Sequence, residues 1–281
     1  MTVDFVDVRG RRARYRVAGD GPPVLLLHGI GRSLRDWSEQ QDLLADEYRT
    51  YSVDLAGFGM SEPLPGKHTL AALAGFAADF LDAVGETGPV HVAGNSLGGA
   101  VAMRLSVDAP ERVRSLALVN SAGFGREVTM ALRLLALRPL GKLLLRPSRS
   151  AAMRVERALF HDRAFATRER VEHALEIARQ PHAARVMLET ARGLGGFRGV
   201  REDWRAELIQ AVAARALPTL VVWGDRDLIL PALHLDAARR ALPHAQTRLF
   251  TGTGHMPQIE RAKEFHDLVT EFWAEQVTTR A

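Results

Sequence analysis

Apolar and polar positions alternate at the start of the chain, from Val3 to Val8 and again from Arg11 to Val17. Alternation with a period of two is typical of strands that have one buried and one exposed face. The two segments meet at Gly10. We therefore expect an antiparallel hairpin at one edge of a sheet.

Short, continuous apolar runs follow the hairpin, and runs of this kind are typical of strands buried on both faces. They cover residues 24–27, 51–53, 90–93, 113–119 and 219–223. Helical patterns separate several of them, as at Leu70–Val84 and Leu97–Asp108, and a strand at Gln246–Phe250 precedes a last helix from about Glu260 to Gln276. Alternating strands and helices predict an α/β fold with a doubly wound, mostly parallel sheet.

The strand pattern is interrupted between residues 124 and 215, where Ala, Leu, Arg and Glu predominate. A stretch of ~90 residues is far longer than an ordinary loop. We expect an inserted helical cap at residues 124–215, and a core formed by residues 1–123 and 216–281.

One cap segment, Arg133–Arg146, combines leucines with widely spaced cations. A basic, leucine-rich helix suits either an apolar acyl pocket or the surface of a membrane. We favour a helix that packs its leucines on the core, with Pro139 interrupting any longer interfacial helix.

Composition limits the chemistry and the setting of this 281-residue chain. Cysteine is absent, which excludes disulfides and thiolate sites. The N-terminus lacks the pattern of a signal peptide, and no apolar stretch is long enough to span a bilayer. We expect a cytoplasmic protein without stable membrane insertion. The net charge of +4 comes mostly from arginine and accompanies no nucleic-acid-reading motif, so we expect no nucleic-acid partner.

A candidate nucleophile lies at Ser96, in the run VHVAGNSLGGA at residues 90–100. The run predicts a strand, a sharp turn and the start of a helix, and it matches the G-x-S-x-G pattern. Gly94 and Gly98 permit the close approach of strand and helix that exposes the serine hydroxyl.

A serine needs a base and an acid to become nucleophilic, and in this arrangement they follow the serine along the chain. His255 directly follows the glycine-rich residues 252–254 after the last strand, and Asp225 and Asp227 follow the strand at 219–223. We expect His255 to be the base. Either aspartate fits the acid, and the spacing to Pro231 favours Asp227.

An oxyanion hole needs two backbone N–H groups near the serine. Leu97, directly after the serine, and Ile30, between Gly29 and Gly31, are the candidates. His28 in the same loop is expected to be structural.

These residues together resemble the α/β-hydrolase superfamily, over nearly the whole chain outside the cap. The motifs occur in the family's order and spacing: LLLHGIG, DLAGFGMSEP, GNSLGGA, VVWGDRDLILP and GTGHMPQIE. The family's acid stands four residues after the tryptophan and four before the proline, which corresponds to Asp227. The resemblance implies a serine hydrolase of the esterase or meta-cleavage product hydrolase branch that needs no cofactor or metal.

The reaction is narrowed by residues next to the triad. Asn95 and the HGIG loop look like those of carbon–carbon bond hydrolases, but those enzymes usually carry tryptophan where this chain has Met256. We expect both Asn95 and Met256 at the substrate pocket. The hypothesis is cleavage of a small or medium carboxylic ester with an apolar acyl group. Carbon–carbon hydrolysis, acyl transfer and a ligand receptor on the same fold are the alternatives.

A dinucleotide-binding site is an alternative interpretation of Gly29–Leu34, which follows a strand, and of Asp54, about 20 residues further on. Leu34 occupies the third glycine position, so the fingerprint is incomplete. The ten histidines show no metal-binding spacing. The expected partner is a small-molecule substrate, and a homo-oligomer stays open.

Overall fold

The computed structural model describes residues 3–278 and contains one eight-stranded sheet in the order β1-β2-β4-β3-β5-β6-β9-β10. Strands β3 to β6, β9 and β10 run parallel, and β2 joins β4 antiparallel. The strands are β1 Val3–Asp7, β2 Arg12–Ala18, β3 Pro23–Leu27, β4 Arg49–Val53, β5 Val90–Asn95, β6 Val113–Val119, β9 Thr219–Gly224 and β10 Gln246–Phe250. The mostly parallel, doubly wound sheet expected from the sequence is confirmed.

The expected edge hairpin is also confirmed, because β1 pairs antiparallel with β2 in the register Asp4 to Tyr15. Arg9 and Gly10 form its turn with φ of 49° and 77°.

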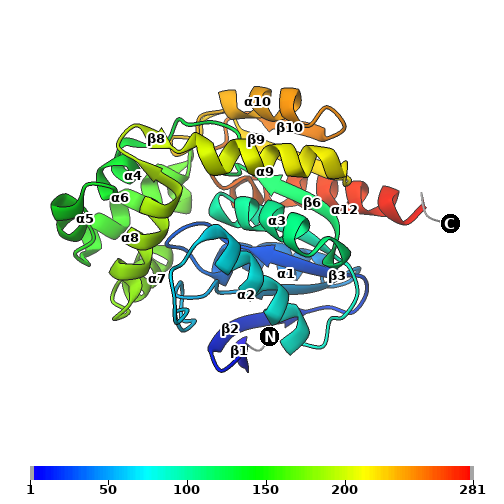
Figure 1. The fold of residues 1–281 in the computed structure, drawn as a ribbon, viewed down its shortest axis with the longest axis horizontal. Helices are drawn as coiled ribbons and strands as arrows, with labels where there is room; N and C mark the ends of the chain where they lie inside the picture. Colours follow the sequence, from blue (N-terminus) through cyan, green and yellow to red (C-terminus); the bar gives the residue numbers. More distant parts are fainter. Residues whose placement is uncertain (1–2, 279–281) are drawn as a thin grey trace.

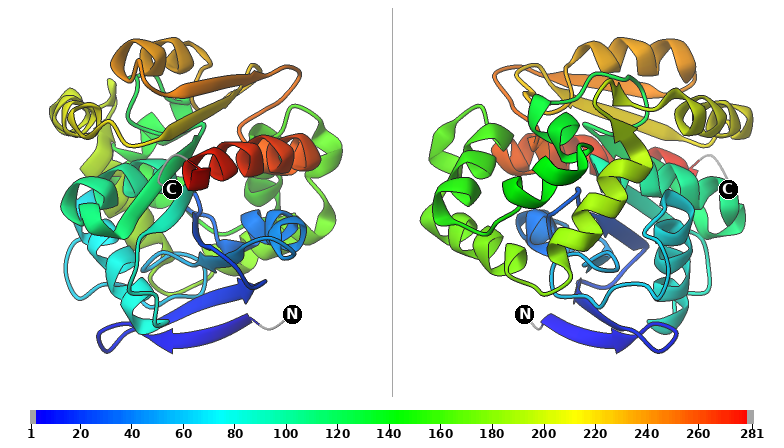
Figure 2. Two further views of the ribbon diagram at one scale, coloured as in Figure 1. Left: turned by 90° about the vertical axis from the view of Figure 1, so that its right-hand side faces the viewer. Right: turned by 60° about the vertical axis from the view of Figure 1, so that its left-hand side comes forward.

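Helices cover both faces of the sheet (Figures 1 and 2). On one face, α2 (Leu70–Ala83), α3 (Leu97–Asp108), α9 (Glu202–Arg215) and α10 (Leu233–Ala241) contribute to the larger hydrophobic core. On the other, α1 (Ser38–Leu44) and α12 (Ala262–Thr278) bury Trp37, Phe265 and Trp273 against the strands. This packing orients the carboxyl ends of the parallel strands toward a third group of helices.

That third group lies between β6 and β9 in the chain and at one end of the molecule, remote from the C-terminal end of α12 (Figure 1). It comprises α4 Met130–Leu135, α5 Arg138–Leu144, α6 Arg149–Leu159, α7 Arg168–Ala178 and α8 Ala183–Leu194. Shorter helices are η1 Leu34–Trp37, η2 Pro110–Arg112, η3 Arg163–Phe165 and α11 Pro257–Glu260.

Two details differ from the sequence expectations. A small two-stranded sheet, β7 (Gly195–Gly196) with β8 (Gly199–Val200), lies within the stretch expected to lack strands. Apolar periodicity does not reveal it because glycines form most of it, and a Cβ on Gly195 would lie 2.9 Å from the Gly199 carbonyl oxygen. The last helix is also divided at Arg261, between α11 and α12.

Among the residues that the structure describes, none belongs to a helix long and apolar enough to cross a membrane.

Candidate active site

Ser96 lies on the turn between β5 and α3 and has φ of 56° and ψ of −116°. A positive φ is unfavourable for a residue with a Cβ, and such strain at a turn is characteristic of functional positions. The turn is held by the Ser96 N–H, which donates to the Val119 carbonyl oxygen at 3.0 Å. The turn therefore places Ser96 at the carboxyl end of β5, a central strand of the sheet.

The glycines on either side leave no space for a side chain. A Cβ on Gly98 would lie 2.2 Å from the Leu27 carbonyl oxygen, and one on Gly94 would lie 2.3 Å from the Gly98 carbonyl oxygen. Gly29 lies so close to the serine that an added Cβ would meet the Ser96 Cβ at 3.3 Å. These contacts bring the loop that follows β3, residues 28–33, against the turn that carries Ser96. We call this segment the β3 loop.

His255 and Asp227 form a buried pair at the carboxyl ends of the neighbouring strands. The Nδ1 of His255 lies 2.7 Å from the Asp227 Oδ2. The other oxygen, Oδ1, accepts from the N–H groups of Ile229 at 2.7 Å and Leu230 at 3.0 Å. Because an ionised carboxylate only accepts, the pair places the imidazole proton on Nδ1 and leaves Nε2 with its lone pair.

Asp225 occupies a different position. Its Oδ1 accepts from the Thr253 N–H at 3.1 Å, and its Oδ2 pairs with the Arg226 guanidinium at 3.4 Å. Of the two aspartates that the sequence leaves open, Asp227 is the one in contact with His255.

Two buried asparagines connect the loops that carry these groups. Asn95 donates through Nδ2 to the His255 carbonyl oxygen at 3.0 Å, which ties the serine turn to the histidine loop. Asn120 donates through Nδ2 to the Asp227 Oδ2 at 2.6 Å. Sequence reasoning missed Asn120, although it directly follows a buried strand, where doubly wound sheets place functional residues.

His28 and Asp54 are both fully buried in the structure around the β3 loop. Burial lowers the pKa of His28 to about 4. Its Nε2 accepts from the Leu55 N–H at 2.9 Å, which agrees with a neutral, structural histidine. Asp54 accepts from the N–H groups of Leu34 at 2.6 Å and Met60 at 2.8 Å. Both oxygens of Asp54 are thus committed within the protein, which argues against ribose binding in the dinucleotide reading.

A cavity of about 630 Å³ has Ser96 and His255 in its lining, together with Gly29, Asn95 and Met256. Most of the remaining lining is aliphatic and comes from both the core and the helices between β6 and β9, including Leu132, Leu135, Leu159, Ile177 and Ile229.

A smaller cavity of about 60 Å³ has Ile30, Ser96 and Leu97 together in its lining. Leu97 is the first residue of α3, so its N–H has no acceptor within the helix. The two residues whose amides are predicted to form an oxyanion hole therefore line one cavity together with the serine.

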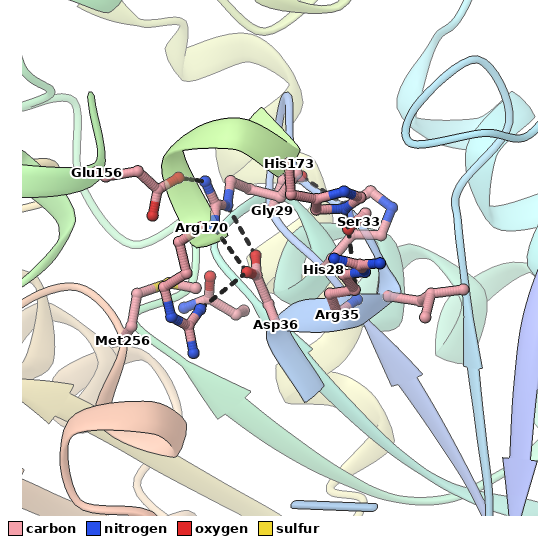
Figure 3. Close-up of polar contacts among 12 residues, drawn as sticks. His28, Gly29, Ser33, Arg35, Asp36, Glu156, Arg170, His173 and Met256 are labelled. Atoms are coloured by element: carbon pink, nitrogen blue, oxygen red, sulfur yellow. Dashed lines mark hydrogen bonds and ion pairs between the residues drawn. The ribbon is translucent and has the colours of Figure 1, made fainter. Parts of the chain in front are cut away.

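A buried group of charges joins the β3 loop to α6 and α7 (Figure 3). The Arg32 guanidinium makes a bidentate contact with Asp36, at 2.8 Å and 2.7 Å, and also donates to Glu156 on α6. Arg170 on α7 approaches Asp36 at 3.9 Å. Burial alone would raise the pKa of Asp36, but Arg32 lowers it below its ordinary value.

Two further contacts lie beside this group. The Ser33 Oγ lies 2.9 Å from the Nε2 of His173 on α7. The His255 N–H donates to the carbonyl oxygen of Leu159, the last residue of α6, at 2.7 Å. The helices above the sheet are thus bonded to both the β3 loop and the histidine loop.

Within the part of the chain that the structure describes, no group of three or more His, Cys, Asp or Glu side chains could hold a metal ion.

Comparisons with known proteins place the chain among hydrolases. A family model described as "alpha/beta hydrolase fold" matches residues 22–262. The dihydrolipoyllysine-residue acetyltransferase component of an acetoin cleaving system from Cupriavidus necator is 38% identical over 268 residues, which cover 94% of this chain and 67% of that protein. A 2-hydroxy-6-oxononadienedioate/2-hydroxy-6-oxononatrienedioate hydrolase from a Pseudomonas species is 30% identical over 266 residues, covering 92% of this chain and 90% of that protein.

A solved hydrolase structure is similar to this chain in its fold. The meta-cleavage product hydrolase of Pseudomonas fluorescens superimposes with a TM-score of 0.81 at 25% identity and covers 97% of both chains.

Proposed function

The chain belongs to the alpha/beta hydrolase fold family, and within it we propose a serine hydrolase that cleaves a carboxylic ester with an apolar acyl group. One observation carries the proposal. His255, bonded to Asp227, lines the same largely aliphatic cavity as the strained Ser96.

The proposed reaction begins with Ser96. Its Oγ attacks the ester carbonyl carbon while Nε2 of His255 accepts the hydroxyl proton. Asp227 holds the imidazole through Nδ1 and stabilises the imidazolium as it forms. His255 then gives the proton to the departing alcohol, which leaves an acyl-serine.

Hydrolysis of the acyl-serine repeats these steps with water as the nucleophile. His255 takes a proton from the water, and the serine oxygen leaves with that proton. In both halves the N–H groups of Ile30 and Leu97 would stabilise the oxyanion, aided by the N-terminus of α3.

The aliphatic lining supports an apolar acyl group. Burial of apolar surface contributes roughly 25 cal/mol per Å², so each additional methylene that fits the cavity adds about 0.8 kcal/mol to binding. We propose that α4 to α8 form the cap that closes this cavity. The contacts of α6 with Arg32 and His255 support that role. Because α9 packs against α3 in the core layer, we end the proposed cap before α9.

Carbon–carbon hydrolysis is the second candidate, favoured by the Pseudomonas relative and by Asn95 beside the serine. Met256, fully buried in the cavity wall where that branch usually has tryptophan, argues for the ester. Acyl transfer to an alcohol or amine would use the same acyl-serine, and the relative named as an acetyltransferase component keeps it a candidate.

The test is hydrolysis of p-nitrophenyl esters from acetate to decanoate, with Ser96→Ala as the control. We expect kcat/KM to rise about threefold to fourfold per methylene until the cavity is filled. Folded protein that cleaves none of these esters, but does cleave a meta-cleavage-type dienoate, would replace the ester proposal with carbon–carbon hydrolysis.

A further inference from the structure

Five large apolar side chains on α4 to α6 are exposed instead of packed on the core. Their exposed fractions range from 40% to 55%. They are Met130, Leu137, Leu143, Leu144 and Val155. The expectation that the leucines of Arg133–Arg146 pack on the core therefore holds for Leu135, which is 5% exposed, and is wrong for Leu137, Leu143 and Leu144. The physical reason is that the chain breaks into α4 and α5 near Pro139, so one apolar stripe is not presented to the core.

The chain segment that carries these apolar side chains is rich in cations, and its one carboxylate is buried. Residues 129–160 contain seven arginines or lysines and one acid, Glu156. Glu156 is fully buried and bonded to Arg32, so it does not neutralise the surface. The exposed cations are Lys142, Arg146, Arg149, Arg154 and Arg157. Of these five, Arg149 pairs with Glu172 at 3.1 Å, and no other carboxylate among the described residues lies within ion-pair distance of them.

We propose that this face, the five exposed apolar residues and five cations together, binds the surface of anionic lipid membranes. We call it the cap tip. Apolar side chains flanked by Lys and Arg are the composition of segments that lie in the membrane interface. Each cation near an anionic lipid surface adds to the attraction.

The charge distribution selects this occupant over a second copy of the chain. Two cap tips facing each other would bring like charges together on both sides, which is destabilising. An acidic protein would pair with the cations, but five protruding aliphatic side chains are better accommodated by acyl chains.

The cap tip shares residues with the cavity that contains Ser96. Met130, Leu144, Val155, Arg146 and Arg154 of the cap tip also line the cavity that contains Ser96. The cavity therefore extends from the serine to residues of the cap tip. Figure 1 shows α5, which carries part of the cap tip, at one end of the molecule. This step rests on the proposed function: a lipophilic ester would pass from the membrane into the cavity without crossing water.

The test is co-sedimentation of the full chain with vesicles of phosphatidylcholine alone or mixed with phosphatidylglycerol. We expect at least tenfold stronger binding to the anionic vesicles, and a loss of that preference in high salt. The double variant Lys142→Glu/Leu143→Ser changes two exposed residues outside the cavity lining, and should bind at least tenfold more weakly while hydrolysing p-nitrophenyl butyrate like the wild type.

The control variant Arg248→Glu/Leu249→Ser, on the edge strand β10, makes matched changes away from the cap and should bind like the wild type. Equal binding to both vesicle types, or undiminished binding by the cap-tip variant, would overturn the proposal. The proposal would also be overturned if the wild type self-associated without binding vesicles and the cap-tip variant were monomeric. Vesicle binding without ester hydrolysis would refute the proposed function and leave the membrane surface standing.

Discussion

A single carboxylate oxygen has two partners at the candidate active site. The Asp227 Oδ2 lies 2.7 Å from His255 Nδ1 and accepts from Asn120 Nδ2 at 2.6 Å. With Oδ1 occupied by two backbone N–H groups, the carboxylate has one orientation. We assign Asn120 the role of positioning Asp227, which in turn positions the imidazole.

The variant Asn120→Gly tests this role, because glycine tolerates the φ of 43° at this position and removes only the side chain. Loss of a hydrogen bond to a charged group costs about 1.5–3 kcal/mol. We expect kcat on p-nitrophenyl butyrate to fall by roughly 10-fold to 100-fold with KM nearly unchanged, since Asn120 does not line the cavity that contains Ser96. A folded variant with kcat within threefold of the wild type would contradict the assignment.

At the scale of residues, the order of the motifs along the chain is what leads sequence reasoning to the candidate site. Ser96, Asp227 and His255 were predicted from strand-end positions, and the structure brings Asp227 and His255 into contact. Asn120 was not predicted because its importance arises only from a contact with a residue 107 positions away. An asparagine after a strand has no distinguishing pattern of its own.

At the scale of elements, the buried charge group connects η1 and the β3 loop to α6. Arg32 is 12% exposed and Glu156 is fully buried, so their interaction is poorly screened by solvent. Removing one member of a buried ion pair leaves an uncompensated charge and costs about 3–5 kcal/mol.

The variant Glu156→Gln should therefore destabilise the protein by about 3 kcal/mol. This is the lower end of the range for a broken buried ion pair, because Arg32 keeps its bidentate contact with Asp36. The exposed pair Arg239–Asp236 provides the control, and Asp236→Asn should cost less than about 1 kcal/mol. Urea unfolding of both variants measures the difference. Equal, small effects would mean that Glu156 does not fasten α6 to the β3 loop.

Elements with strong periodicity were predicted well. The helix expected at Leu97–Asp108 matches α3, and the apolar runs correspond to β3, β4, β5, β6 and β9. The helices α4 to α8 of the proposed cap were harder to predict, because their ends do not follow from apolar periodicity alone. The break between α4 and α5 leaves leucines exposed. The pattern of apolar positions in Arg133–Arg146 does not predict this exposure.

At the scale of the whole molecule, buried histidines make stability depend on pH. Burial lowers the pKa of both His28 and His91 to about 4, below the value of ~6.5 in an unfolded chain. Between pH 6.5 and 4 the unfolded chain binds more protons at these residues, so stability falls as pH falls. Asp54 and Glu260 act in the opposite direction, because burial raises the pKa of Asp54 to about 6 and also raises that of Glu260. Burial lowers the pKa of three further histidines, His173, His182 and His234, so the histidines outnumber these two carboxyls.

We expect the free energy of unfolding to decrease from pH 7 to pH 4, with His91 contributing on the order of 3 kcal/mol at most. The variant His91→Gln should show a shallower decrease, measured by urea unfolding at pH 4.5, 5.5 and 7. Parallel pH curves for the two proteins would contradict a neutral, buried His91.

The topology of the whole molecule was predicted only in outline. Alternating strands and helices indicate a doubly wound sheet, and the pairing of β1 with β2 follows from their adjacency. The placement of β4 between β2 and β3 makes β2 pair with β4 and β3 pair with β5, which are not consecutive strands in the chain, and no local pattern encodes that choice.

Intact mass after incubation with a fluorophosphonate probe, which reacts preferentially with an activated serine, tests most directly whether Ser96 is the nucleophile. We predict one adduct on the wild type and none on Ser96→Ala, matched by loss of p-nitrophenyl butyrate hydrolysis in the variant. No adduct on folded wild-type protein, or equal labelling of both proteins, would contradict Ser96 as the nucleophile.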